Sequence, residues 1–164
     1  MANNITFEGN AMQIINKMND EFAVFLEEAS GELEAQTKRK TKVGKVNGGN
    51  TKQKWTHVVD EGKLEAVVGN PQETAIWLEF GTGDYALEGN GRKGGWWILI
   101  GEGSGMISQS VVDAYGFKIG YGSNGKKYAF TRGMKPQRPL HNAKESTKGK
   151  IQRRFEQICK ELGD

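Results

Sequence analysis

Residues 10–35 read NAMQIINKMNDEFAVFLEEASGELEA, and the first element of the fold follows from this pattern. The apolar side chains recur every three or four positions, at Ile15, Met18, Phe22, Phe25, Ala29 and Leu33. This spacing gathers them on one face of a helix, while acidic side chains fill the opposite face. The stretch therefore predicts a long amphipathic helix near the N-terminus.

A second helical pattern lies near the other end of the sequence. The face of this helix is traced by Leu140, Ala143, Thr147, Ile151, Phe155, Ile158 and Leu162, all apolar except the threonine. Pro136 and Pro139 precede it, and proline is favoured at the start of a helix. We expect a long C-terminal amphipathic helix.

The chain between these helices predicts short strands and one short helix. Residues 55–60 and 63–69 have the composition of a β-hairpin, and residues 71–79 follow a helix-start signature. Residues 96–100 predict a strand, and a second hairpin spans residues 115–130 around an Asn-Gly turn. The order predicts an α+β fold, with an antiparallel β-sheet, long N-terminal and C-terminal amphipathic helices and a short central helix.

Two segments interrupt these elements. Residues 37–54 are basic and contain glycine, which predicts a flexible loop. Residues 101–126 are rich in glycine. With 164 residues in all, we expect residues 1–164 to form a single domain.

Charge is distributed unevenly along the chain. The net charge is −6 over residues 1–37, +7 over residues 38–54 and +4 over residues 134–164. Surfaces of opposite sign are therefore expected to meet, within one subunit or between neighbouring subunits.

The sequence contains little that predicts catalysis. Residues 120–127 nearly match a phosphate-binding loop, and residues 89–94 match GxGxxG, but neither opens a helix as those motifs require. His57 and His141 are far apart in sequence, and Cys159 is the only cysteine, beside the apolar face of the last helix, where packing is its expected role. We expect no enzyme activity, no metal site and no cofactor. The longest apolar run, residues 96–100, is also too short to cross a membrane.

Two clusters contain side chains that turn formation alone does not require. Residues 79–96 contain Glu-Phe-Gly-Thr-Gly followed by Gly-Arg-Lys-Gly-Gly-Trp, and residues 131–140 read TRGMKPQRPL. Both place an aromatic ring or a guanidinium group beside residues that fix the backbone geometry.

In this order the clusters resemble those of a family of small neck proteins of long-tailed bacteriophages, known as head–tail joining or minor tail-component proteins. The resemblance also includes the Trp-containing strand after the basic loop and the Val67-Val68-Gly69-Asn70-Pro71 stretch, so it covers nearly the whole chain. The sequence departs from the family in two places. Residues 42–47 replace the turn that usually follows the first helix. Residues 101–125 are longer than the usual link, which implies an enlarged β-hairpin over about residues 101–126.

The resemblance implies a virion subunit that assembles in the host cytoplasm into a ring around the DNA channel. Its expected partners are other neck and tail proteins, with DNA passing nearby without sequence-specific recognition. The residues expected to build or present the contact surface are Phe80, Gly81, Thr82, Gly83, Trp96, Pro136, Arg138 and Pro139.

Two alternatives remain open at this point. One is a tail terminator protein, which caps the tail tube. The other is a non-specific DNA-binding protein that uses residues 38–54 for electrostatic contact with phosphates. The candidate contacts are Lys38, Arg39, Lys40, Lys42 and Lys45.

Overall fold

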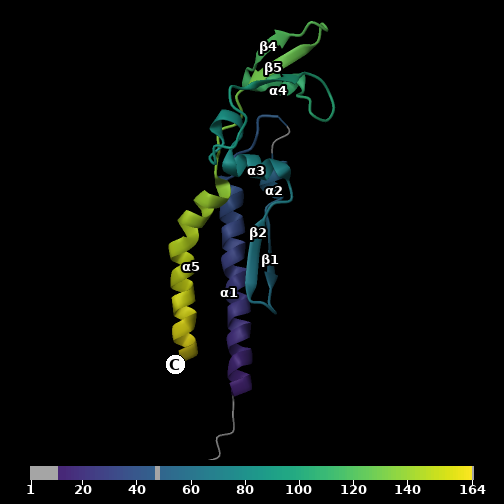
Figure 1. The fold of residues 1–164 in the computed structure, drawn as a ribbon. Coiled ribbons are helices and arrows are strands. Elements are labelled where there is room, and N and C mark those ends of the chain that lie inside the picture. Colours follow the sequence, from purple (N-terminus) through teal and green to yellow (C-terminus); the bar gives the residue numbers. More distant parts are fainter. Residues whose placement is uncertain (1–10, 47–48, 164) are drawn as a thin grey trace, which may run out of the picture.

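Two long helices, α1 (Ala11–Lys40) and α5 (Pro139–Gly163), run antiparallel along the lower half of the molecule (Figure 1). The computed structural model describes residues 11–46 and 49–163. Phe155 of α5 packs on Phe22 and Phe25 of α1, with ring centroids 6.0 and 5.5 Å apart. The apolar periodicity of both ends of the sequence thus forms one helix–helix interface, and both predicted terminal helices are confirmed.

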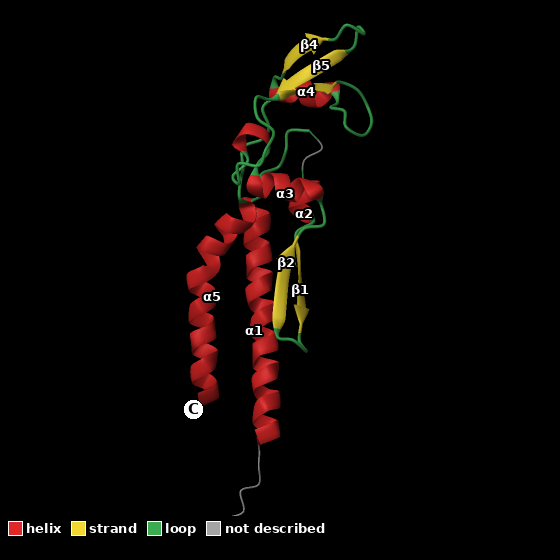
Figure 2. Ribbon diagram, in the orientation of Figure 1, coloured by secondary structure: helices red, strands yellow, loops and turns green. Residues whose placement is uncertain are grey.

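A β-hairpin packs on α1 and is confirmed as predicted from the sequence (Figure 2). Its strands are β1 (Thr56–Asp60) and β2 (Glu65–Gly69), which pair antiparallel. Alternate side chains are half-buried, whereas the cross-strand partners Val58 and Val67 are both 67% exposed. One face of this small sheet therefore remains uncovered.

Short elements form the middle of the molecule. They are α2 (Asn50–Gln53), α3 (Glu73–Phe80) and the 3₁₀ turn η1 (Gly83–Tyr85). The central helix is confirmed, but it begins at Glu73 and not at Pro71. The side chain of Asn70 accepts the Gln72 N–H in a local turn, so Asn70 does not cap the helix.

The upper end of the molecule is a separate three-stranded sheet, made of β3 (Trp96–Leu99), β4 (Lys118–Tyr121) and β5 (Lys127–Thr131). The strand order is β3-β5-β4 and both pairings are antiparallel. The predicted antiparallel pairing and α+β class are confirmed, with the strands divided between two small sheets.

The segment expected to be an enlarged hairpin contains a further helix, α4 (Gln109–Tyr115). The hairpin itself is limited to β4, β5 and the turn between them, so the expectation for residues 101–126 was wrong in extent. The strand expected from residue 115 instead begins at Lys118. Gly116, at φ 65°, adopts the left-handed conformation that ends a helix. The alternating aromatic residues from Tyr115 onward predicted a strand across this helix end.

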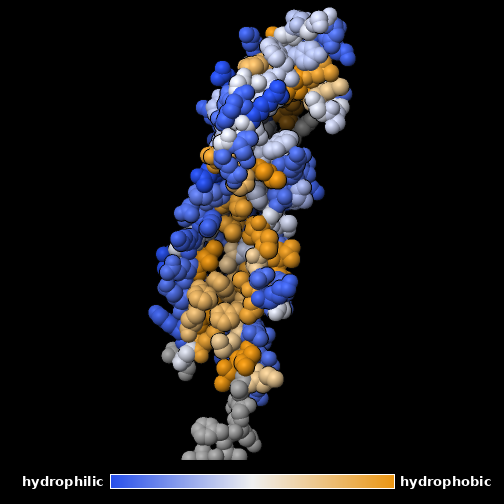
Figure 3. Space-filling model, in the orientation of Figure 1, coloured by the Kyte–Doolittle hydropathy of each residue, from blue (hydrophilic) through white to orange (hydrophobic). Residues whose placement is uncertain are grey.

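Few side chains are fully buried for a chain of this size. The buried apolar residues are Trp55, Ala75, Leu78, Val112, Ala129, Ala143 and Ile158. The accessible surface is 11622 Å², against about 8,100 Å² for a compact monomer of this mass. An apolar band is visible along the lower half of the molecule in Figure 3.

No helix among the described residues is both long enough and apolar enough to cross a membrane.

Candidate interaction site

The two sequence clusters meet in the middle of the molecule. We call this region, residues 78–85 together with 131–141, the junction. The Thr82 N–H donates to the Met134 carbonyl at 2.9 Å, and the Met134 N–H donates back to the Thr82 hydroxyl at 2.9 Å. The Asp84 N–H donates to the Arg132 carbonyl at 2.9 Å. Segments about fifty residues apart in sequence are therefore held together as a pair.

The glycines of the junction are required by its close packing. A Cβ on Gly83 would overlap the Arg132 carbonyl oxygen and lie 2.8 Å from the Trp96 ring. A Cβ on Gly81 would lie 2.8 Å from the Pro136 ring. Both glycines also have positive φ, at 61° and 74°, where other residues are strained. Their role is to let two backbone segments approach each other.

The start of α5 is held by α3. Two N–H groups in the first turn of α5, those of Leu140 and His141, donate to the Glu79 carboxylate at 2.9 Å each. These donors have no partner within their own helix, so a carboxylate from another helix acts as the cap. The Gln137 and Arg138 N–H groups both donate to the Leu78 carbonyl, at 2.7 and 3.1 Å.

Most of the predicted contact residues therefore have a folding role in the junction. Thr82 supplies hydrogen bonds, and Pro139 is fully buried at the first turn of α5. Arg138 has a φ of 55°, a left-handed conformation that is costly for a residue with a side chain. Trp96 is half-buried, and the Arg92 guanidinium lies 5.6 Å from the centre of its ring.

Phe80 is the exception, because its side chain is 46% exposed. Ile76, one helical turn earlier, is 59% exposed, so α3 presents an apolar ridge to solvent. A hollow of about 430 Å³ adjoins this ridge, and Arg138 and Lys144 contribute to its wall. The Glu79 carboxylate lines the same hollow, so the arrangement offers apolar contact beside charges of both signs, which suits a protein partner.

The basic segment is more structured than the sequence predicts. Helix α1 continues to Lys40, and Asn50–Gln53 forms α2, so the loop expected over residues 37–54 was wrong at both ends. Thr37 is buried and donates to the Leu33 carbonyl within the helix. Lysine and arginine also favour a helix, particularly in its last turn.

The remainder of this segment contacts both halves of the molecule. The Trp55 indole N–H donates to the buried Thr41 hydroxyl at 2.9 Å. The Lys42 N–H donates to the Gln137 side chain at 3.3 Å, and the Lys45 N–H to the Tyr115 hydroxyl at 2.9 Å. The Lys45 ammonium group donates to the Ala114 carbonyl. Arg39 is exposed at the end of α1.

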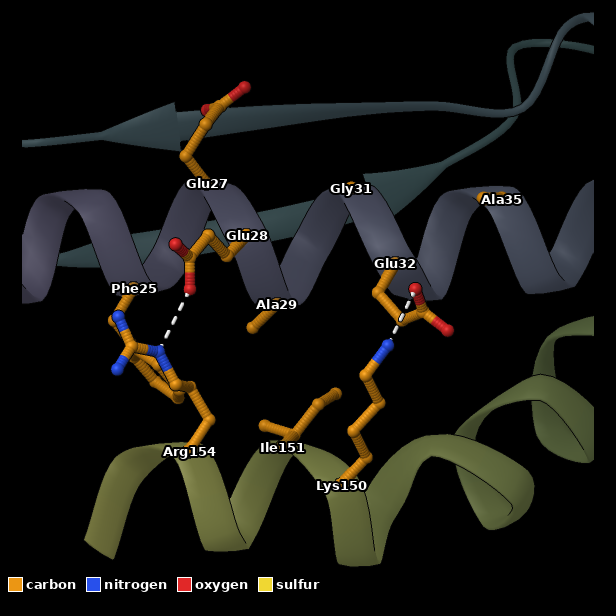
Figure 4. Close-up of a pocket in the computed structure, with 10 residues that line it drawn as sticks. All are labelled: Phe25, Glu27, Glu28, Ala29, Gly31, Glu32, Ala35, Lys150, Ile151 and Arg154. Atoms are coloured by element: carbon orange, nitrogen blue, oxygen red, sulfur yellow. Dashed lines mark hydrogen bonds and ion pairs between the residues drawn. The ribbon is translucent and has the colours of Figure 1, made fainter. Parts of the chain in front are cut away.

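The acidic face of α1 pairs with α5 of the same chain. Glu28 binds Arg154 at 3.1 Å and Glu32 binds Lys150 at 3.2 Å, and both pairs cross the groove between the helices (Figure 4). The hydrogen bond from Gln36, then the one from Lys150, lowers the pKa of Glu32. Opposite charges thus meet within the subunit, between its first and last segments.

His57 of β1 joins the hairpin to α1. One ring nitrogen lies 2.9 Å from the Glu27 carboxylate and the other is hydrogen-bonded to Glu34. The bond to Glu27 and then that to Glu34 raise the pKa of His57. The bond from Lys38, followed by that from His57, lowers the pKa of Glu34.

His57 with Glu27 and Glu34, and the groove between α1 and α5, are the charged clusters of the lower half. No group of three or more histidine, cysteine or acidic residues suited to a metal ion is found in the described part of the chain. Cys159, expected to pack, is exposed instead.

Sequence reasoning did not identify Glu79 or the acidic partners of His57. Glu79 lay within the Glu-Phe-Gly-Thr-Gly cluster, but its bonding partners are 61 and 62 residues further along the chain. A signal for Glu27 and Glu34 was their position on one side of α1, seven residues apart.

Comparison of the chain with models of protein families, with curated proteins and with solved structures finds no match.

Proposed function

We propose that this chain is a structural subunit of the neck of a tailed bacteriophage, acting through protein–protein contacts in a ring around the DNA channel. The family assignment depends on the resemblance carried by the two junction clusters. The physical observation that carries the subunit role is the large amount of apolar surface left uncovered.

The surface excess is of the size of a protein interface. Thirteen residues lie outside the described ranges, and unfolded chain of that length exposes about 2,100 Å². When this area is subtracted from the accessible surface of 11622 Å², the remainder still exceeds the surface of a compact monomer by more than about 1,000 Å². A standard interface covers about 800 Å² on each partner. The excess, polar and apolar surface together, is therefore larger than the area that a standard interface covers on one partner.

Exposed apolar residues occur on several faces. Met12 and Ile14, near the start of α1, are 71% and 57% exposed, the Val58–Val67 pair lies on the hairpin, and Phe80 lies on α3. A ring subunit presents two different faces, one to each neighbour, because its contacts are head-to-tail. Separate apolar surfaces suit this role better than a single patch.

The neck role is tested by electron microscopy of lysates from a phage that lacks only this gene. DNA-filled heads separated from finished tails would support a joining role. Missing or overlong tails would instead support the tail terminator alternative. Normal infectious particles would overturn both structural roles.

The DNA-binding alternative is tested by replacing Lys38, Arg39, Lys40 and Lys42 with alanine. A neck subunit should lose little affinity for duplex DNA, because Lys38 already pairs with Glu34. A DNA-binding protein should instead show steep salt dependence that becomes shallower in the variant.

A further inference from the structure

One face of the upper sheet gathers aromatic side chains in adjacent rows. The register pairs Trp97 with Phe130, and Phe130 with Lys118. The next row joins Leu99, Tyr128 and Gly120. Residues directly opposite each other on paired strands point to the same side. We call this side the aromatic face, and alternation along the chain places Lys126 on it as well.

The other side of the sheet carries Ala129 and its cross-strand partner Ile119, which is 40% exposed. Ala129, which alternates with Tyr128 and Phe130, has no exposed surface. Helix α4, whose Val112 is 1% exposed, is joined to β4 by only two residues. On the aromatic face, Trp97 is 47% exposed.

The aromatic face is hollowed and its rings are positioned. A hollow of about 380 Å³ is lined by Trp97, Tyr121, Tyr128 and two glycines of β4 and the following turn. A Cβ on Gly120 would lie 2.7 Å from the Trp97 ring, so glycine allows the indole to lie against the strand. The Tyr128 hydroxyl accepts a hydrogen bond from the Asn124 side chain at 3.1 Å. Both rings are thus set in place before any ligand arrives.

Positive charge borders these rings and negative charge is absent from the same strands. Lys118 and Lys126 are exposed at opposite ends of the aromatic face, about 13 Å apart along the strand direction. Within the described residues neither lysine forms an ion pair. The strands β3, β4 and β5 and the β4–β5 turn contain no aspartate or glutamate.

We propose that the aromatic face binds single-stranded nucleic acid. Unpaired bases would stack on Trp97 and Tyr128, and the phosphates beside them would contact Lys118 and Lys126. Non-specific single-strand binding combines these two features, aromatic stacking surfaces and a basic path for the backbone. A duplex keeps its bases inside and cannot use the rings. The site is distant in sequence from residues 38–54 and does not depend on the neck role.

The test measures the anisotropy of a fluorescent fifteen-residue oligothymidylate mixed with the full chain, alongside a fifteen-base-pair duplex. We expect the single strand to bind more tightly than the duplex. Trp97→Leu should weaken binding about tenfold, because it keeps an apolar side chain but loses the stacking surface. Trp97→Phe should restore most of the affinity. Circular dichroism of each variant verifies that the sheet is folded.

The lysines are tested with a charge-matched control. The double variant Lys118→Ala/Lys126→Ala should reduce the slope of log affinity against log salt by about 1.4, the value for two contacts to a single strand. Lys148→Ala/Lys160→Ala on α5 removes the same charge and should leave the slope unchanged.

Three results would overturn the proposal: no binding of the single strand, tighter binding of the duplex, or equal loss of affinity in both double variants. The proposal would also be overturned if the binding of the oligonucleotide did not depend on salt and a proline-rich peptide displaced it while unlabelled single strand did not. That result would indicate a peptide-binding face.

Discussion

At the residue scale, Glu79 connects two helices that are far apart in the sequence. Its carboxylate accepts N–H groups from Leu140 and His141, both in the first turn of α5. A capping residue ordinarily belongs to the helix that it caps. Here the cap comes from α3, so the same contact that completes α5 also fixes α5 against the junction.

Replacing this carboxylate should destabilise the whole fold. We expect Glu79→Ala to lower the free energy of unfolding by about 1–3 kcal/mol, because two donors lose a charged acceptor. Urea denaturation followed by circular dichroism measures the change. The control is Glu102→Ala, which removes an exposed carboxylate from a loop. Equal stability of the two variants would show that the cap contributes nothing.

His57 should make stability depend on pH. Its pKa is raised in the folded state, by Glu27 first and then by Glu34. The stabilisation is therefore complete below the unfolded pKa of about 6.5 and is lost as pH rises through the higher folded pKa. We expect the free energy of unfolding to fall as pH rises above about 6.5.

The variant His57→Gln isolates this contribution. It should be less stable than the wild type at pH 6, and the difference should shrink at pH 8. Glu27→Gln should reduce the pH dependence in part, because Glu34 remains. A stability difference that is the same at both pH values would contradict the role of a charged histidine.

At the element scale, local pattern predicted the helices and hairpins but not their ends. The apolar spacing from Ile15 to Leu33 and from Leu140 to Leu162 is enough to locate α1 and α5, because the period of a helix is visible within a few turns. The continuation of α1 through Thr37 depends on a side-chain bond and on burial against the rest of the fold. Such tertiary effects override a loop-like composition.

The residues of the junction could be located from the sequence, but the pairing of its two segments could not be predicted from it. The clusters around Gly81 and Gly133 stand out as unusual, yet the hydrogen bonds that join them span about fifty residues. No local pattern states which segments pair. The sequence therefore indicated the residues, while their role in folding came from the structure.

Gly83 and Gly116 have similar φ angles, so alanine substitutions at these two positions distinguish the cost of lost close packing from the cost of backbone strain. Gly83 has φ 61° and lies against the Arg132 carbonyl, whereas Gly116 has φ 65° and no atom within 4 Å of its added Cβ. We expect Gly116→Ala to cost about 1 kcal/mol of unfolding free energy, from strain alone. Gly83→Ala should cost about 2–4 kcal/mol, because the paired backbones must also move apart. Equal costs in urea denaturation would mean that the junction is loosely packed.

At the scale of the whole molecule, the arrangement is elongated and has two ends of different character. Helices α1 and α5 with one hairpin form the lower end, and the three-stranded sheet forms the upper end (Figure 1). The junction holds them together through backbone hydrogen bonds. Such a shape exposes more surface per residue than a compact domain does, and some of that surface is apolar at both ends.

This shape leads to a prediction about self-association. If the first turns of α1 contact a neighbouring copy, the weight-average mass in sedimentation equilibrium should rise above 18.1 kDa as concentration increases. Ile14, 57% exposed, should contribute through burial of its side chain. Ile14→Lys should therefore weaken association about tenfold or more.

The matched control is Asn16→Lys, which adds the same charge at an exposed position two residues along the same helix. It should change the association constant less than about twofold if it lies outside the contact. Neither substitution should alter the urea midpoint by much, because both side chains are already exposed in the single chain. Equal weakening by both variants would indicate a charge effect and not apolar contact. A mass of 18.1 kDa at every concentration would argue that the apolar surface of α1 is covered by a different protein.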